Sequence, residues 1–235
     1  NNTALGKAAL YTNTTADNNT AVGFQALYTS TGPANSALGH NALFNNTTGE
    51  QNVAIGKDAL HVNTTASNNT AVGVEALKAN TTGASNVAVG QGALIANTTA
   101  ANNTAIGTSA LAANTTGANT VAVGKSALAA NTTADGNTAI GNSSMVDCTT
   151  GSENTALGNY AAENVTTGGN NTALGRSAGA AIQSGSNNIA VGYGADCAHD
   201  SANSITLGVG ITGVGDYFKF GKASNVVSNQ FTSDA

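Results

Sequence analysis

The chain is built from one short unit that repeats along most of its length. A small residue, an aliphatic residue and a glycine recur in that order, as in Ala4-Leu5-Gly6 and Ala190-Val191-Gly192. Thirteen glycines mark the unit: Gly6, Gly23, Gly39, Gly56, Gly73, Gly90, Gly107, Gly124, Gly141, Gly158, Gly175, Gly192 and Gly208. Ten of the twelve intervals between them are 17 residues, and the other two are 16. A fixed period of this length is typical of a solenoid, in which each repeat stacks on the next.

Each position in the unit is named here by its offset from the repeat glycine. Asn is common at −4, Ala at −2, Val, Ile or Leu at −1, Ala at +3, Leu at +4 and Asn-Thr-Thr from +7. A unit with a glycine corner and an Asn/Thr-rich loop leaves too little room for a helix. The pattern predicts two short strands, at −3 to −1 and at +2 to +5. The fold class is therefore all-β, a parallel β-solenoid or β-roll of about thirteen 17-residue coils.

The period is lost after Gly208, and we expect two domains. Residues 1–208 form the β-solenoid repeat domain, and residues 209–235 form an aromatic-rich C-terminal cap or neck. A final coil without a cover would expose an open sheet edge, which favours aggregation. Aromatic side chains are expected to close it: Tyr217, Phe218, Phe220 and Phe231.

Apolar residues occur at neighbouring positions of the first predicted strand. Ala occupies −2 in twelve of thirteen units, and −1 is aliphatic in every unit. Ala26-Leu27 and Ala59-Leu60 repeat the pattern at +3 and +4. Since neighbouring strand residues face opposite sides, one face fills the coil and the other needs a partner. The simplest partner is another copy of the chain, so we expect a homo-oligomer.

Charge and hydropathy exclude several classes of partner. Only 8% of residues are charged, the net charge is −5, and the seven Lys and Arg residues are scattered singly. No basic stripe indicates nucleic acid or anionic membrane as a partner. No apolar run approaches the ~18 residues of a membrane-spanning helix. The chain opens inside a repeat without an initiator Met, and we expect it to be a portion of a longer protein.

Candidate chemical groups are sparse, and we expect no enzyme activity, cofactor or metal. Cys148 and Cys197 lie about three coils apart, beyond the reach of a disulfide, and are expected to be free and inert. The three histidines occupy different columns, which argues against a metal site: His40, His61 and His199.

Asp58 and Glu75 share position +2 in adjacent coils. Their carboxylates could lie about 5 Å apart, the spacing of retaining glycosidases. The rest of that column indicates solvated surface, and no flanking aromatic residues suggest a sugar cleft. A polysaccharide-cleaving tailspike is kept as a lower alternative.

Asn-x-Thr triplets recur, as in Asn13-Thr14-Thr15 and Asn97-Thr98-Thr99, and match the glycosylation acceptor pattern. We expect their main role to be structural, with stacked Asn and Thr side chains hydrogen-bonded from coil to coil. The Thr columns leave an ice-binding solenoid as another lower alternative. Two adjacent threonines, however, cannot both project from one strand face.

The repeats resemble two families of fibrous proteins. Asn52-Val53-Ala54-Ile55-Gly56 and Asn86-Val87-Ala88-Val89-Gly90 are similar to the head repeats of trimeric autotransporter adhesins, whose consensus is Asn-Ser-Val-Ala-Ile-Gly. Asn19-Thr20-Ala21-Val22-Gly23 is more similar still to repeats of bacteriophage tail fibres. The longer unit favours the phage branch. The resemblance covers about residues 1–208 and implies a left-handed β-roll assembled as a parallel homotrimer.

The C-terminal segment extends this resemblance. Residues 216–221 and 228–235 resemble the stretch that precedes an endosialidase-type intramolecular chaperone, which trimerises its fibre and cuts itself away. This implies that Ala235 lies near a mature C-terminus. The expected function is a structural and adhesive virion tail fibre, extracellular, that attaches to a host surface glycan or protein. The alternative is a bacterial trimeric adhesin head. We expect the exposed contacts among the variable residues at +1 and +2: Lys7, His40, Lys57, Asp58, Glu75, Lys125 and Arg176.

Overall fold

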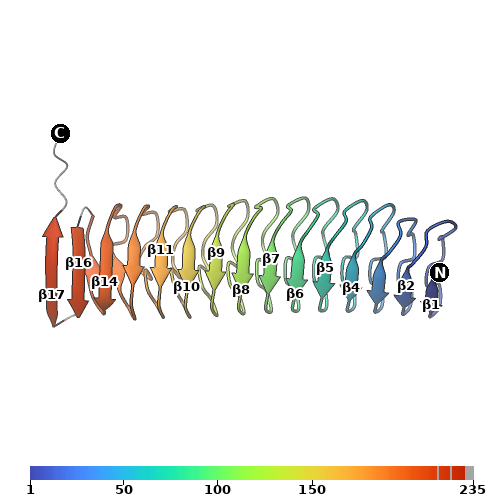
Figure 1. The fold of residues 1–235 in the computed structure, drawn as a ribbon, viewed down its shortest axis with the longest axis horizontal. Coiled ribbons are helices and arrows are strands. Elements are labelled where there is room, and N and C mark those ends of the chain that lie inside the picture. The colour runs from blue at the N-terminus through green and yellow to red at the C-terminus, as the bar shows by residue number, and fades with distance from the viewer. Residues whose placement is uncertain (216, 223, 231–235) are drawn as a thin grey trace. The chain divides into compact units, whose positions relative to one another are not determined.

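The computed structural model describes residues 1–215, 217–222 and 224–230. The chain folds as an all-β parallel solenoid of about thirteen coils with a repeat of about 17 residues, which confirms the predicted fold class (Figure 1). In the described part of the chain, no helix is long and apolar enough to cross a membrane. The chain divides into two compact units, Asn1–Asn119 and Thr120–Ala235.

In the first unit, every coil contributes one three-residue strand to a parallel sheet. Neighbouring strands pair in chain order, and equal repeat positions face each other, as Ala37 faces Ala54. The 16-residue interval before Gly39 does not disturb this register, because Ala21 still faces Ala37. The strands are β1 (Thr3–Leu5), β2 (Thr20–Val22), β3 (Ser36–Leu38), β4 (Val53–Ile55), β5 (Thr70–Val72), β6 (Val87–Val89) and β7 (Thr104–Ile106).

The second unit continues the same pattern and then changes. Parallel pairing in chain order extends through β14 to β16, and β17 pairs with β16 antiparallel. A separate short pair joins β13 to β15. The strands are β8 (Val121–Val123), β9 (Thr138–Ile140), β10 (Thr155–Leu157), β11 (Thr172–Leu174), β12 (Ile189–Val191), β13 (Asp196–Cys197), β14 (Ile205–Val209), β15 (Thr212–Gly213), β16 (Tyr217–Lys222) and β17 (Asn225–Gln230).

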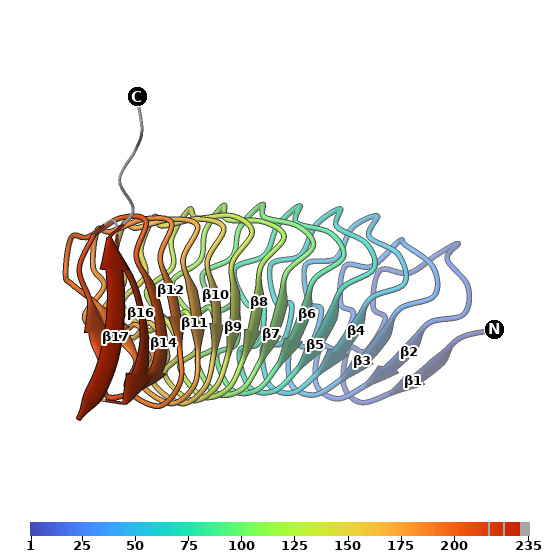
Figure 2. The same cartoon turned by 60° about the vertical axis from the view of Figure 1, so that its left-hand side comes forward.

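The predicted second strand, at +2 to +5, is wrong for most coils. The backbone there forms consecutive turns, and the residues at +2 and +4 are left-handed, as Gln25 (φ 53°) and Leu27 (φ 51°) are. This curvature turns both Ala26 and Leu27 into the core, where each is fully buried. The +3 and +4 columns therefore need no partner chain. Figure 2 shows these turns and the following loops stacked from coil to coil within each unit.

The repeat glycines form the corner that follows each strand. Gly73 has a φ of +136°, a conformation that essentially only glycine adopts. A β-carbon at Gly73 would also lie 2.5 Å from the carbonyl oxygen of Gly90 in the next coil. The glycine column thus permits both the corner and the close stacking of adjacent coils.

Two columns of buried asparagine satisfy the polar backbone inside the coils. At −4, the backbone amide of Asn52 donates to Oδ1 of Asn35 at 2.9 Å, and Asn52 Nδ2 donates to the Ala66 carbonyl. At +7, Asn97 Nδ2 donates to Asn80 Oδ1 at 2.8 Å and to the Ala100 carbonyl. These side chains are fully buried, and water does not reach them. Their hydrogen bonds therefore satisfy buried backbone and amide groups that would otherwise have no partner.

A threonine ladder at +8 runs along the outside of the loop. Thr47 Oγ1 donates to the Thr64 carbonyl at 2.8 Å, and Thr64 Oγ1 donates to the Thr81 carbonyl at 3.1 Å. The predicted Asn and Thr ladders are therefore confirmed. The neighbouring +9 threonines, such as Thr65 and Thr82, are exposed.

The core changes composition along the second unit. At +4, Leu128 is followed by Met145, Ala162 and Gly179, so the side chain becomes smaller from coil to coil. At +7, Asn131 is followed by apolar replacements that become larger from coil to coil: Cys148, Val165 and Ile182. Side chains from +4 and +7 therefore exchange volume within the same core.

A β-hairpin covers the last coil. β16 pairs parallel with β14, and β17 pairs antiparallel with β16 (Figure 1). Tyr217, Phe218 and Phe220 lie in β16, but Phe220 is 45% exposed. The last coil is therefore covered mainly by the paired backbone of the hairpin and less by buried aromatic side chains. The fourth predicted cap residue, Phe231, lies outside the described residues.

Candidate functional site

In each unit, the outer face of the sheet carries an aliphatic column. From the second coil onward, position −2 is buried in the core, whereas the aliphatic side chain at −1 points outward. In the first unit, Leu38 is 48% and Ile106 is 40% exposed, and in the second unit Leu157 is 42% exposed. Thr or Val side chains at −3 lie beside this column and are half-buried or exposed. A soluble protein rarely leaves such a regular apolar stripe uncovered.

The variable +1 position is exposed in every coil. Lys7, His40, Lys57, Lys125 and Arg176 lie there, as predicted. The expectation for Asp58 is wrong, because this residue is buried, with 9% of its surface exposed. Glu75 is half-buried, and its Oε1 is 2.7 Å from Nζ of Lys78. This contact raises the pKa of the Lys78 ammonium above its ordinary value.

Four consecutive coils of the first unit carry a stack of aromatic rings at +5. The rings belong to Tyr11, Tyr28, Phe44 and His61. Their centroids are 5.1, 5.0 and 5.3 Å apart, and neighbouring planes differ by 5 to 16°. We call this stack the aromatic ladder. Its residues are separated by 17, 16 and 17 positions, a signal that aligning the repeats by column would have shown.

Polar side chains lie directly beside the aromatic ladder. Asn41 Nδ2 donates to Asp58 Oδ1 at 3.1 Å, and Nδ1 of His61 lies 3.8 Å from the same oxygen. Asn41 Oδ1 and His61 Nδ1 are buried without a hydrogen-bond partner. The expectation that no aromatic residue flanks Asp58 is therefore wrong. Phe24 at +1 stacks on His40 with centroids 5.1 Å apart.

Asp58 and Glu75 do not have the surroundings of a catalytic carboxyl pair. Asp58 is buried against Asn41, with Lys57 Nζ 3.7 Å from its Oδ2, and Glu75 pairs with Lys78. Each carboxylate thus already has its own partner.

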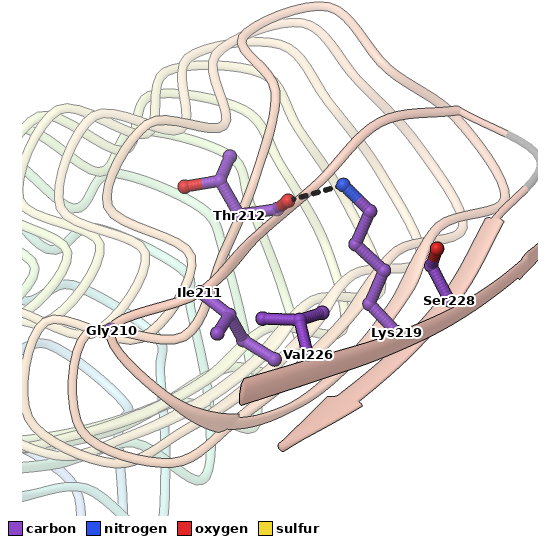
Figure 3. Close-up of a pocket in the computed structure, with 6 residues that line it drawn as sticks. All are labelled: Gly210, Ile211, Thr212, Lys219, Val226 and Ser228. Atoms are coloured by element: carbon purple, nitrogen blue, oxygen red, sulfur yellow. Dashed lines mark hydrogen bonds between the residues drawn. The ribbon is translucent and has the colours of Figure 1, made fainter. Parts of the chain in front are cut away.

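A cavity of about 380 Å³ lies between the last coil and the C-terminal hairpin (Figure 3). Lys219 points across it, and its Nζ donates to the Thr212 carbonyl at 3.0 Å. Its walls mix backbone, apolar and hydroxyl groups from Gly210, Ile211, Thr212, Lys219, Val226 and Ser228. The ammonium is therefore already bonded within the chain.

Three further titratable groups, Cys148, Asp196 and Cys197, lie in the second unit. Cys148 and Cys197 are buried free thiols, and burial raises the pKa of each to about 11. Burial also raises the pKa of Asp196, whose carboxylate accepts from the Ala181 amide. Within residues 1–215, 217–222 and 224–230, no three His, Cys, Asp or Glu side chains gather as a metal site would require.

Sequence comparisons do not assign the chain to a family. No protein-family model matches it, and no curated protein matches its sequence.

Proposed function

We propose that this chain is the repeat shaft or distal head of a trimeric virion tail fibre, a structural and adhesive element that attaches to a host surface. The observation that carries the proposal is the outward aliphatic column at −1. It repeats in every coil, while the neighbouring −2 alanines fill the interior. A partner with the same repeat offers a matching column along its whole length.

Burial of this column would contribute substantial free energy to assembly. Side chains such as Ile55 and Leu174 are 39% and 41% exposed in the single chain. Covering each of them is worth about 1 kcal/mol at the usual value for apolar surface. Because the gain repeats with every coil, association would grow stronger with the number of coils.

The interior is suited to a mechanical role. Each coil is bonded to the next by strand pairing, by the asparagine columns and by the threonine ladder. Nearest-neighbour bonding of this kind gives a repeat protein its stability. The number of chains, three, rests on the resemblance to trimeric fibre repeats.

Light scattering on the purified chain tests the assembly. We expect a particle of three times the 22.8 kDa chain mass. Ile55→Asp with Ile140→Asp places charges in the −1 column of both units and should yield monomers. Thr99→Asp, at an exposed loop position, is the matched control and should leave the mass unchanged. A monomeric wild-type chain would overturn the proposal.

A bacterial trimeric adhesin head would use the same surface. The parent gene separates the two: a chaperone domain downstream supports the tail fibre, and a coiled coil with a membrane-anchoring barrel supports the adhesin.

A further inference from the structure

The outward −1 column of the second unit continues onto the C-terminal hairpin. Phe220 in β16 pairs in register with Leu207 in β14, and Val227 in β17 lies opposite Phe220. Residues paired in register lie on the same face of a sheet, so the column runs on through Phe220 and Val227. Phe220 is 45% and Val227 is 53% exposed, against 41% for Leu174 in an earlier coil. The hairpin thus carries the most exposed part of this column in the described second unit.

The side chains between these hairpin residues point the other way. Lys219 crosses the cavity of Figure 3, and Val226 and Ser228 line the same cavity. Since side chains alternate along a strand, Phe218 lies on the outer face with Phe220, and their ring centroids are 5.5 Å apart. Phe218 and Phe220 therefore lie outside the core that they were expected to close.

The −3 column on the same face also becomes apolar toward the hairpin. Thr155 and Thr172 are followed in register by Ile189, Ile205 and Phe218. Both outward columns are therefore apolar at this end of the sheet, whereas the preceding coils have threonine at −3. We call the outward side chains of the last three strands the C-terminal apolar patch: Ile205, Leu207, Phe218, Phe220 and Val227.

We propose that the C-terminal apolar patch packs against the same patch of other copies of the chain and holds the C-terminal ends of the assembly together. The inference rests on the proposed function, in which parallel copies cover each other's −1 columns. Symmetry then brings equal residues together, so copies that cover Leu157 and Leu174 also bring their hairpins into contact. Uncharged aromatic and aliphatic side chains are typical of the core of such an interface. Because aromatic rings bury a large area, the patch should contribute more to association than an ordinary coil.

Light scattering over a dilution series of the full chain tests the patch. Phe220→Thr with Val227→Thr removes two exposed apolar side chains and keeps residues that favour a strand. The concentration at which the particle dissociates should rise by about tenfold or more. The matched control is Tyr193→Thr with Val214→Thr. It also removes an exposed aromatic residue and an exposed valine of the second unit, but from outside the two columns, and should dissociate as the wild-type chain does.

A second variant keeps every apolar side chain of the patch. Asn229 is exposed in β17 and lies opposite Phe218, so Asn229→Asp would bring like charges together in the assembly. We expect this variant to dissociate more readily than the wild-type chain at low salt, and added salt to restore part of the loss. It tests the patch even if the threonine variant unfolds the hairpin.

The outcomes separate this inference from the proposed function. A wild-type trimer that is matched in stability by either patch variant overturns the inference alone, as does an equal loss in the control. A wild-type chain that is monomeric at every concentration overturns the proposed function as well. A wild-type dimer that both patch variants weaken would overturn the trimer and leave the patch in place.

Discussion

Gly179 and Ile182 fit against each other in the core of the second unit: a β-carbon on Gly179 would lie 3.2 Å from Cδ1 of Ile182. In the consensus coil the same two positions hold a large apolar residue and a smaller polar one, as in Leu94 and Asn97. The two positions therefore share one volume.

This shared volume predicts a coupled response to substitution. Gly179→Leu alone should destabilise the chain by about 1–3 kcal/mol, because the core around Ile182 has no room for the larger side chain. Adding Ile182→Asn restores the consensus pair and should recover part of that loss. A double-mutant cycle followed by urea denaturation measures the coupling. Strictly additive effects would show that the two positions do not exchange volume.

Gly90 and Gly92 offer a matched pair of glycine substitutions. At Gly90, φ is +135° and a β-carbon would lie 2.5 Å from the Gly107 carbonyl oxygen. Gly90→Ala should therefore cost about 3 kcal/mol or more. At Gly92, φ is +64° and the nearest atom, Ser109 Oγ, is 4.0 Å away. Gly92→Ala should cost only about 1 kcal/mol. Thermal unfolding of the two variants compares these losses of stability. Similar losses would contradict the inference that the corner at Gly90 requires a glycine.

The buried asparagine column at +7 should be sensitive to truncation. Asn97→Ala removes one of the two side-chain donors of the Ala100 carbonyl, the other being Asn86 Nδ2, and removes the acceptor of Asn114 Nδ2. We expect a loss of about 2–3 kcal/mol in the free energy of unfolding, measured in urea. Thr99→Ala, two residues away and exposed, is the control and should change little. If both variants are equally stable, the asparagine column at +7 does not stabilise the coil.

The buried thiols predict a loss of stability in alkaline solution. Burial raises the pKa of Cys148 from 9.0 to about 11, and that of Cys197 to about the same value. The folded chain thus favours the protonated thiol. The buried thiols contribute fully to the free energy of unfolding below pH 9. This contribution is lost between about pH 9 and 11, because the thiols of the unfolded chain ionise at lower pH than those of the folded chain. The melting temperature should fall over this range, and less so in Cys148→Ala with Cys197→Ala.

The same burial predicts low reactivity. At pH 8, a thiol reagent should label neither cysteine in the native chain and both in urea. Rapid labelling without urea would show that the thiols are accessible.

The period, the glycine corner and the first strand could be predicted from the sequence because each depends on one repeated residue type. The second strand could not. Ala26-Leu27 and Ala37-Leu38 are the same dipeptide, but in the first pair both residues are buried and in the second only Ala37 is. The left-handed backbone of Leu27 makes the difference, and leucine gives no sign of that conformation.

The surfaces were predictable in part. The outward −1 column followed from the alternation of side chains along a strand. The burial of Asp58 did not, because it depends on the side chains of Asn41, Lys57 and His61 from two coils. The aromatic ladder was present in the sequence, but its rings become neighbours only when the 16-residue interval before Gly39 is taken into account.

The register between coils has a consequence for how such a chain changes over generations. Most bonds between coils join residues 16 or 17 positions apart, and each coil offers its neighbour nearly the same set of donors and acceptors. Loss or duplication of one whole unit within a run of similar coils would bring together two surfaces that already match. Unequal recombination between repeats can therefore alter the length of the protein without the need to evolve a new interface.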